Sequence, residues 1–252
     1  MRLLLLPESF HGQKVFKITG KDARYLWSVL RLPVGQNITA RDAGGRFWNL
    51  LLVSGSSSAC TVNTSPLQAP KENTDALPCC GELVPITLYQ CLTKPRKLEQ
   101  IVRQATEIGV DRIVLVRSRY SCTEPFRQER LSAQLKEAIQ QSGSTVTTRI
   151  EGPIEISAVP SDASACPTPL FFHQTSLKDQ RTIAQALDSL KSPGAVLIGP
   201  EGGLDDDECT LLRNGGWEPV LLQTNILRAE TAAVYALALV QTALQASDRK
   251  KD

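Results

Sequence analysis

The sequence lacks the residue clusters that hold metals or build disulfide frameworks. Its seven cysteines are scattered, their number is odd, no two are spaced as Cys-x-x-Cys, and only His11 and His173 could add imidazole ligands. Structural zinc sites need ligands in closely spaced pairs. We therefore expect no metal ion and reduced, inert thiols, including the adjacent Cys79 and Cys80.

Long apolar runs and phosphate-binding motifs are missing too. The apolar opening Met1–Leu6 is too short for a signal peptide, and Pro7 and Glu8 end it, so an N-terminal edge strand is the better interpretation. We therefore expect no membrane partner and a cytoplasmic location. Neither a Gly-Lys-Ser/Thr phosphate loop nor a Rossmann fingerprint occurs, which argues against nucleoside triphosphates and dinucleotides as ligands.

Charge alone does not identify a partner, because the net charge is only +2. Local clusters matter more than the total when RNA is the partner. Two clusters are candidates for RNA contacts: Lys94, Arg96, Lys97 and Arg103 in one, and Arg112, Arg117 and Arg119 in the other. A solvated helix face or strand end explains them equally well.

The first 63 residues are rich in short strand-like runs. These runs are Leu3–Leu6, Gln13–Ile18, Asn37–Arg41 and Arg46–Val53. Gly44-Gly45 predicts a hairpin between the last two, and Gly20–Leu32 predicts one helix. The pattern favours a small β-barrel-like domain. Ser54–Ser58 and Asn63–Gly81, rich in Ser, Pro, Asn and Gly, predict a linker or an irregular late strand.

From Leu83 onward, apolar strands alternate with helices. The expected strands are Leu83–Cys91, Val110–Arg117, Leu170–His173, Gly194–Gly199 and Pro219–Leu222. The expected helices are Arg96–Ile108, Gln128–Gln141, Lys178–Leu190, Asp205–Arg213 and Ala229–Gln245, with Gly109 as the C-terminal cap of the first. This alternation predicts an α/β domain with a mostly parallel sheet that is covered on both faces.

Three loops follow strand ends, where open parallel sheets bind ligands. They are Phe171–Ser176, Ile198–Gly203 and Leu222–Arg228. Gly-Pro-Glu-Gly-Gly in the second loop lets a ligand approach the backbone, and the acids from Asp205 to Glu208 disfavour phosphate, so a neutral adenine fits better. A plain strand-to-helix turn, and a surface pair between Arg228 and Glu230, are the simpler alternatives. His173 is more often structural than catalytic in such a position.

These motifs occur with three others in a fixed order. Gly199–Gly203 follows an apolar strand, and Ile226–Ala232 (Ile-Leu-Arg-Ala-Glu-Thr-Ala) opens the last helix. Val29–Leu32, Ala105–Gly109 and Glu137–Gly143 precede them. Together they resemble the RsmE-type ribosomal RNA uridine N3-methyltransferases of the knotted SPOUT superfamily, over nearly the whole chain.

The resemblance implies an α/β fold in two domains: a PUA-like RNA-binding β-barrel at 1–75 and a SPOUT methyltransferase domain with a deep C-terminal trefoil knot at 82–247. It implies S-adenosylmethionine (SAM) as cofactor, small-subunit (16S) ribosomal RNA or the 30S particle as substrate, and a homodimer. Implied cofactor contacts are Phe172, His173, Ile198, Gly199, Pro200, Gly202, Gly203, Leu222, Gln223, Asn225, Ile226, Leu227, Ala229, Thr231 and Ala232.

For catalysis, the resemblance points to Arg228 as the group that orients the uracil carbonyls or stabilises developing negative charge. Glu201 or Glu230 assists proton removal or only braces a loop. The expected RNA contacts are Arg31, Lys94, Arg96 and Arg119.

The sequence departs from the family pattern at several positions on the RNA side. These are Arg24-Tyr25, Ser118–Ser121, Ser144 and Leu222–Asn225. Two rival hypotheses therefore stay open: a non-catalytic RNA-binding protein of the same fold, and a related methyltransferase that acts on another RNA site.

Overall fold

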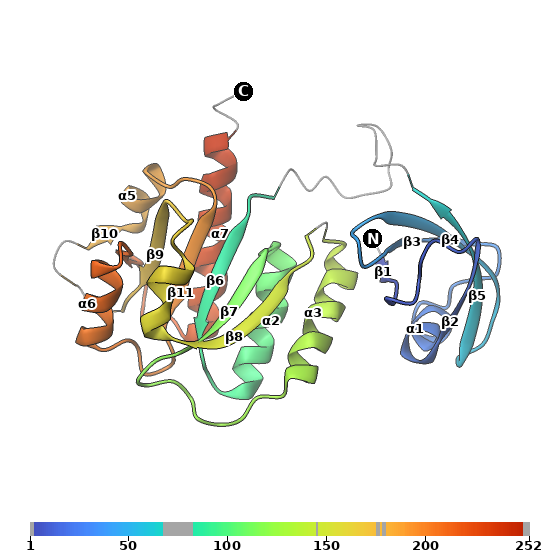
Figure 1. Ribbon diagram of the computed structural model, residues 1–252, viewed down its shortest axis with the longest axis horizontal. Helices are drawn as coiled ribbons and strands as arrows, with labels where there is room; N and C mark the ends of the chain where they lie inside the picture. Colours follow the sequence, from blue (N-terminus) through green and yellow to red (C-terminus); the bar gives the residue numbers. More distant parts are fainter. Residues whose placement is uncertain (1–2, 68–82, 145, 175–176, 178–179, 249–252) are drawn as a thin grey trace. The chain divides into compact units, whose positions relative to one another are not determined.

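The computed structural model describes residues 3–67, 83–144, 146–174, 177 and 180–248. Two units are distinct (Figure 1): residues 1–80 with 139–145, and residues 81–138 with 146–252. Cys79, Cys80 and the expected domain boundary between 75 and 82 lie outside the described residues. Within the described part of the chain, no helix is long and apolar enough to cross a membrane.

Unit 1 is built on a sheet with the strand order β1-β3-β4-β5-β2. The strands are β1 (Leu3–Leu5), β2 (Val15–Thr19), β3 (Asn37–Arg41), β4 (Phe47–Gly55) and β5 (Ala59–Pro66). β1 is an edge strand, as predicted, and pairs in parallel with β3, whereas the other pairings among these five strands are antiparallel. The predicted hairpin between β3 and β4 is confirmed, because Gly45 takes the positive φ of 83° that its turn requires.

Two segments of unit 1 differ from expectation. Residues 63–66, expected in a linker or an irregular late strand, belong to the regular strand β5, in which buried Cys60 and Val62 alternate with more exposed side chains. The predicted helix Gly20–Leu32 is a short α1 (Gly20–Arg24) followed by the π-helix η1 (Tyr25–Val29). The wider π-turn rotates the side chains relative to an α-helix, so Leu26 is buried while Val29 is 64% exposed.

Unit 2 contains a sheet whose described strands have the order β10-β12-β9-β11-β6-β7-β8, and every pairing among them is parallel. These strands are β6 (Ile86–Cys91), β7 (Arg112–Arg117), β8 (Arg149–Glu155), β9 (Thr168–Phe172), β10 (Arg181–Thr182), β11 (Gly194–Ile198) and β12 (Glu218–Leu221). The helical segments are α2 (Pro95–Ile108), α3 (Gln128–Ser142), η2 (Ile156–Ala158), α4 (Val159–Asp162), α5 (Ile183–Asp188), α6 (Asp206–Asn214) and α7 (Ala229–Asp248).

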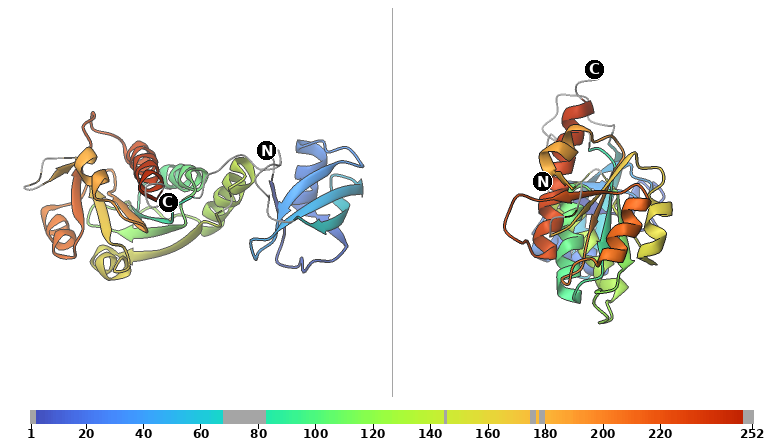
Figure 2. Two further views of the ribbon diagram at one scale, coloured as in Figure 1. Left: turned by 90° about the horizontal axis from the view of Figure 1, so that it is seen from above. Right: turned by 90° about the vertical axis from the view of Figure 1, so that its left-hand side faces the viewer.

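Both faces of this sheet are covered, which confirms the predicted α/β architecture. Alternate strand residues face opposite ways: Leu88 packs with α2, α3, α5 and α7, whereas Tyr89 packs with α4 and α6. Figure 2 shows α2 and α7 on one side of the sheet and α6 on the other. The buried strands therefore read as continuous apolar runs, as the sequence indicated.

Two elements of unit 2 differ from expectation. The predicted helix Lys178–Leu190 is wrong in extent, because α5 begins only after a Thr182–Gln185 capping box, and Arg181–Thr182 is a strand. The sequence also gave no hint of β8, since Gly152-Pro153 in its middle is typical of a turn. Proline is tolerated there because β8 is an edge strand.

Helix caps fix the segments that surround the strand ends. α2 begins with Pro95 in its first turn and ends at Gly109, whose φ of 94° confirms the predicted cap. The neighbours β12, β9 and β11 all end at the same edge of the sheet, because they run parallel. The loops that follow Phe172, Ile198 and Leu221 are thereby brought together.

Candidate functional site

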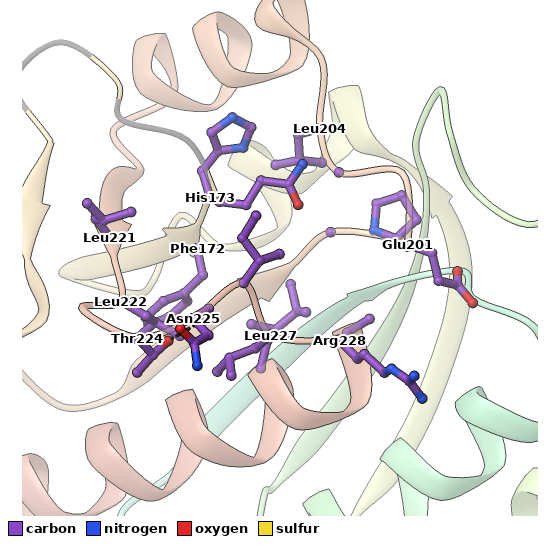
Figure 3. Close-up of a pocket in the computed structure, with 18 of the residues that line it drawn as sticks. Phe172, His173, Glu201, Leu204, Leu221, Leu222, Thr224, Asn225, Leu227 and Arg228 are labelled. Carbon is purple, nitrogen blue, oxygen red and sulfur yellow. Dashed lines mark hydrogen bonds between the residues drawn. The ribbon is translucent and has the colours of Figure 1, made fainter.

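A cavity of about 500 Å³ lies where these three loops meet the starts of α2 and α7 (Figure 3). It is lined by Lys97, Phe172, His173, Gln174, Ile198, Gly199, Pro200, Glu201, Gly203, Leu204, Leu221, Leu222, Gln223, Thr224, Asn225, Ile226, Leu227, Arg228, Ala229 and Ala232. Its size is typical of small-molecule sites, and its lining combines aliphatic side chains with neutral amides and exposed backbone.

The loop after β11 is held by its glycines and by a helix cap. The Gly203 N–H donates to the Pro200 carbonyl (3.0 Å), and the φ of Gly203 is 77°. Asp205 then caps α6, because its carboxylate accepts from the Glu208 N–H (2.7 Å). Gly202 faces away from the cavity lining, and a Cβ there would lie only 2.8 Å from Cβ of Tyr120.

The loop after β12 contains no glycine and is fixed where α7 begins. The Arg228 carbonyl accepts from the N–H groups of Thr231 (2.9 Å) and Ala232 (2.8 Å), which makes the first turn of α7. Ile226 is 77% exposed, whereas Leu227 is half-buried against the cavity. Backbone and apolar groups of this loop thus face the cavity together.

Three charged side chains meet at the α2 end of the cavity. Lys97 Nζ lies 3.6 Å from Glu201 Oε1 and 3.4 Å from Glu230 Oε2. Glu201 Oε1 also accepts from the Lys94 N–H (3.3 Å), at the start of α2. Glu230 therefore pairs with Lys97 and not with Arg228, which contradicts the simple surface pair between Arg228 and Glu230. Figure 3 shows Arg228 and Glu201 on the same side of the pocket.

His173 lies across the pocket from Arg228 (Figure 3). Its Nδ1 is 3.9 Å from the sulfur of Cys209 in α6. Burial lowers the pKa of His173, against an opposing effect of Asp206, and burial raises the pKa of Cys209 to about 11. Both groups are therefore neutral near pH 7.

The expected RNA contacts lie in different settings. Lys94 and Arg96 are exposed at the start of α2, and Arg31 is exposed in unit 1 with a φ of 49°. Arg119 is exposed but pairs with Asp205 (3.0 Å). Arg112 and Arg117 are also paired with acids. Acidic partners thus offset the second basic cluster.

Sequence reasoning placed most of the cavity lining but missed five residues of it: Lys97, Gln174, Leu204, Leu221 and Thr224. Three expected site residues do not line the cavity: Gly202, Glu230 and Thr231. Lys97 was assigned to a basic patch, and no local pattern reveals that its ammonium meets two carboxylates from segments more than one hundred residues away.

The lining selects among ligand classes. Glu201 at the rim disfavours a polyphosphate, whereas the amides of Gln223 and Asn225 and the loop backbone suit an uncharged planar ring. Among the residues that the structure describes, no group of three or more His, Cys, Asp or Glu side chains could hold a metal ion. The cavity therefore fits a nucleoside-sized organic ligand.

Comparisons with known proteins match this chain to RNA methyltransferases. The family model of the RNA methyltransferase domain matches residues 81–241. A ribosomal RNA small subunit methyltransferase E from Aquifex aeolicus is 32% identical over 161 residues, which cover 62% of this chain and 67% of that protein. Its counterpart from Synechocystis sp. is 27% identical over 248 residues, or 97% of this chain and 78% of that protein.

The fold has solved relatives as well. A crystal structure of ribosomal RNA small subunit methyltransferase E from Neisseria gonorrhoeae, bound to S-adenosyl methionine, superposes with a TM-score of 0.79 at 23% identity. The match covers 97% of this chain and 98% of that one, so both units have a counterpart there.

Proposed function

This chain belongs to the RNA methyltransferase domain family and, within it, to the ribosomal RNA small subunit methyltransferase E proteins, and from this premise we propose that it transfers the methyl group of SAM to N3 of a uridine in 16S ribosomal RNA. The observation that carries the proposal is the cavity formed by the Gly-Pro-Glu-Gly-Gly loop and the start of α7. The SAM-bound relative supports the choice of cofactor.

SAM fits the cavity by chemistry as well as by size. The backbone of Gly199–Gly203 and of Leu222–Leu227 would hold the adenine, and the aliphatic side chains around it exclude water. Phe172 and His173, at the end of β9, and Ala229 and Ala232, at the start of α7, complete the set of contacts. When bound, SAM supplies a methyl group activated by a cationic sulfonium.

Arg228 is the group that we assign to the uridine. Its exposed guanidinium stands at the cavity mouth and presents a fork of donors to uracil carbonyls. As N3 loses its imino proton, negative charge spreads onto those carbonyls, and a fixed guanidinium stabilises it. Because Glu201 and Glu230 both contact Lys97, we assign them to bracing the loops, and the proton leaves to solvent water.

We also propose the deep trefoil knot that the resemblance implies. The strand order supports it: β12 lies outside β9, yet α7 packs against α2 and β11 near the middle of the sheet. The chain must therefore cross back over the ends of β9 and β11 after leaving β12. Such threading is rare, and it would hold the two cavity loops against each other.

Unit 1 is assigned to RNA binding as a PUA-like domain, and the active molecule is proposed to be a cytoplasmic homodimer. Exposed Arg31 follows a π-helix that also carries the partly exposed Trp27. Lys94 and Arg96 would contribute phosphate contacts in unit 2. Residues on the outer face of α7 would form the contact between the two copies.

A combined binding and turnover experiment tests the proposal. Calorimetry should detect one SAM per chain, and tritium from methyl-labelled SAM should appear in 16S RNA or 30S particles from a strain that lacks the gene. Mass spectrometry should then map the label to N3 of a single uridine. SAM binding without transfer would support the non-catalytic rival, and a methyl group at another atom or in another RNA would support the second rival.

A further inference from the structure

The ammonium group of Lys97 lies between two carboxylates, one from the loop after β11 and one from the first turn of α7. Glu201 belongs to the Gly-Pro-Glu-Gly-Gly loop, and Glu230 lies in the first turn of α7. Lys97 Nζ contacts both, at 3.6 Å and 3.4 Å. The Glu230 side chain is only 11% exposed, and its Oε2 has no hydrogen-bond partner.

We propose that Lys97 is a positioning residue that clamps the Glu201 loop to the start of α7, and thereby shapes the cofactor pocket before SAM binds. This inference rests on the proposed function for its ligand. The clamp itself is a property of the protein without ligand.

Lys97 holds the pocket together because its positive charge offsets the negative charges of Glu201 and Glu230. Without the ammonium, two carboxylates would face each other in a partly buried site, where like charges repel more strongly than in water. Glu201 is the partner that can move into solvent, because 30% of its side chain is exposed, against 11% for Glu230. The loop would therefore move away from α7 and take its backbone contacts with it.

Glu201 has a second anchor that makes α2 the fixed side of the clamp. The Lys94 N–H donates to Glu201 Oε1, so the carboxylate lies at the positive end of the α2 dipole. Lys97 lies in the first turn of the same helix, and α2 packs against α7 through the buried core. Movement of the loop is thus resisted by two groups from one rigid element.

Two other roles for Lys97 give different kinetic results. Loss of a phosphate-binding lysine would raise the KM for RNA and weaken the salt dependence of RNA binding. Loss of a residue that touches the reacting atoms would lower kcat. Loss of a clamp raises the Kd and KM for SAM and leaves kcat nearly unchanged at saturating SAM, because bound SAM itself draws the loops together.

The test uses the full-length protein and five variants, one of which is Glu201→Gln alone. Lys97→Met should raise the Kd for SAM about tenfold, and Lys97→Arg should raise it only about threefold or less. Lys97→Met combined with Glu201→Gln should recover most of the lost SAM affinity, because Glu201→Gln removes a negative charge that Lys97 balances. Arg103→Met, which removes an exposed charge from the same helix, should leave the Kd unchanged.

Thermal unfolding without SAM provides a readout that needs no turnover. The destabilisations by Lys97→Met and Glu201→Gln should be non-additive, with the double variant less destabilised than their sum. Additive effects would overturn the clamp, as would an unchanged Kd for SAM in Lys97→Met or a loss confined to kcat. If the wild-type protein bound no SAM, the proposed function would be wrong. The unfolding measurements on the single and double variants would still test the clamp, because they need no ligand.

Discussion

At the scale of single residues, we expect Arg228 to be needed for methyl transfer but not for SAM binding. Its guanidinium is exposed at the cavity mouth, while its carbonyl starts α7. Arg228→Ala should therefore lower the rate of methyl transfer at least about a hundredfold, as expected for a group of this kind. The Kd for SAM should change little. Single-turnover transfer and calorimetry measure the two effects.

Arg228→Lys is the matched control, because it keeps the charge and loses the planar fork. It should restore only a small part of the rate. Normal turnover in Arg228→Ala would remove this residue from the mechanism.

Gly203 combines a positive φ with a position beside the cavity. A side chain at its φ of 77° costs about 1–2 kcal/mol, and its Cβ would lie 3.2 Å from Nε2 of Gln174, a flexible group that lines the cavity. Gly203→Ala should thus lower stability and also push Gln174 into the ligand space, which weakens SAM binding about tenfold.

Gly216 offers the comparison for this prediction. Its φ is 83°, and a Cβ there meets nothing within 4 Å. Gly216→Ala should show a similar loss in melting temperature with an unchanged Kd for SAM. Equal losses of affinity in the two variants would mean that the strain, and not the position, is responsible.

At the scale of elements, a network of charged groups ties α4 to three neighbouring strand segments. Arg112 of β7 contacts Asp162 of α4 through two nitrogens (2.8 and 3.0 Å) and Glu151 of β8 (2.8 Å). The Tyr89 hydroxyl of β6 donates to Asp162 Oδ2 (2.6 Å). Burial and Asp162 raise the pKa of Tyr89, and Arg112 and Tyr89 hold the pKa of Asp162 below its usual value.

Asp162→Asn should destabilise the protein by about 1–3 kcal/mol at neutral pH. Because the carboxyl pKa is lower in the folded than in the unfolded state, its contribution is present above the unfolded pKa and is lost as pH falls through the folded one. The difference between wild type and variant, measured by denaturant unfolding, should therefore shrink below about pH 4.

Glu155→Gln removes a partner from the exposed Arg117–Glu155 contact (3.8 Å) and serves as the control. Its effect should be close to zero, since exposed pairs contribute little. A constant difference between wild type and Asp162→Asn from pH 7 to pH 3 would contradict the assigned network.

The same scale explains which elements the sequence could predict. The apolar runs that become β6, β7 and β11 carry their own signal because both faces are buried. β8 carries none, because it is an edge strand with a Gly-Pro bend, and its place depends on pairing with β7. The π-helix η1 is likewise marked by a bond from the Leu30 N–H to the Tyr25 carbonyl, five residues back, which periodicity does not reveal.

The cavity loops were predictable because each follows the end of a strand, and two of them lead directly to a helix, so their positions depend on chain order. The role of Lys97 was not predictable, because α2 and α7 are far apart in the sequence and become neighbours only when they pack on the same face of the sheet. The sequence around a lysine on a helix surface is the same whether its ammonium group faces solvent or two carboxylates. Pairing across long separations is tertiary information, and it decides the electrostatics of this site.

At the scale of the whole molecule, the exposed face of α7 points to a second copy of the chain. Its exposed positions Thr231, Tyr235, Ala238 and Thr242 are spaced by four, three and four residues, the seam spacing of packed helices. Small residues flank Tyr235, which is 42% exposed. The Thr242 hydroxyl already donates to the Ala238 carbonyl (2.8 Å), so burial of this face leaves that donor satisfied.

Tyr235→Arg should therefore convert a dimer to a monomer, because a desolvated charge at the centre of a helix seam opposes association. Sedimentation velocity at micromolar concentration measures the change, and Val15→Arg, at an apolar residue of unit 1 that is 59% exposed, should leave the dimer intact. Since α7 begins at the cavity mouth beside the 77% exposed Ile226, loss of the dimer should also lower methyl transfer. A variant that is monomeric and fully active would place the whole site within one chain.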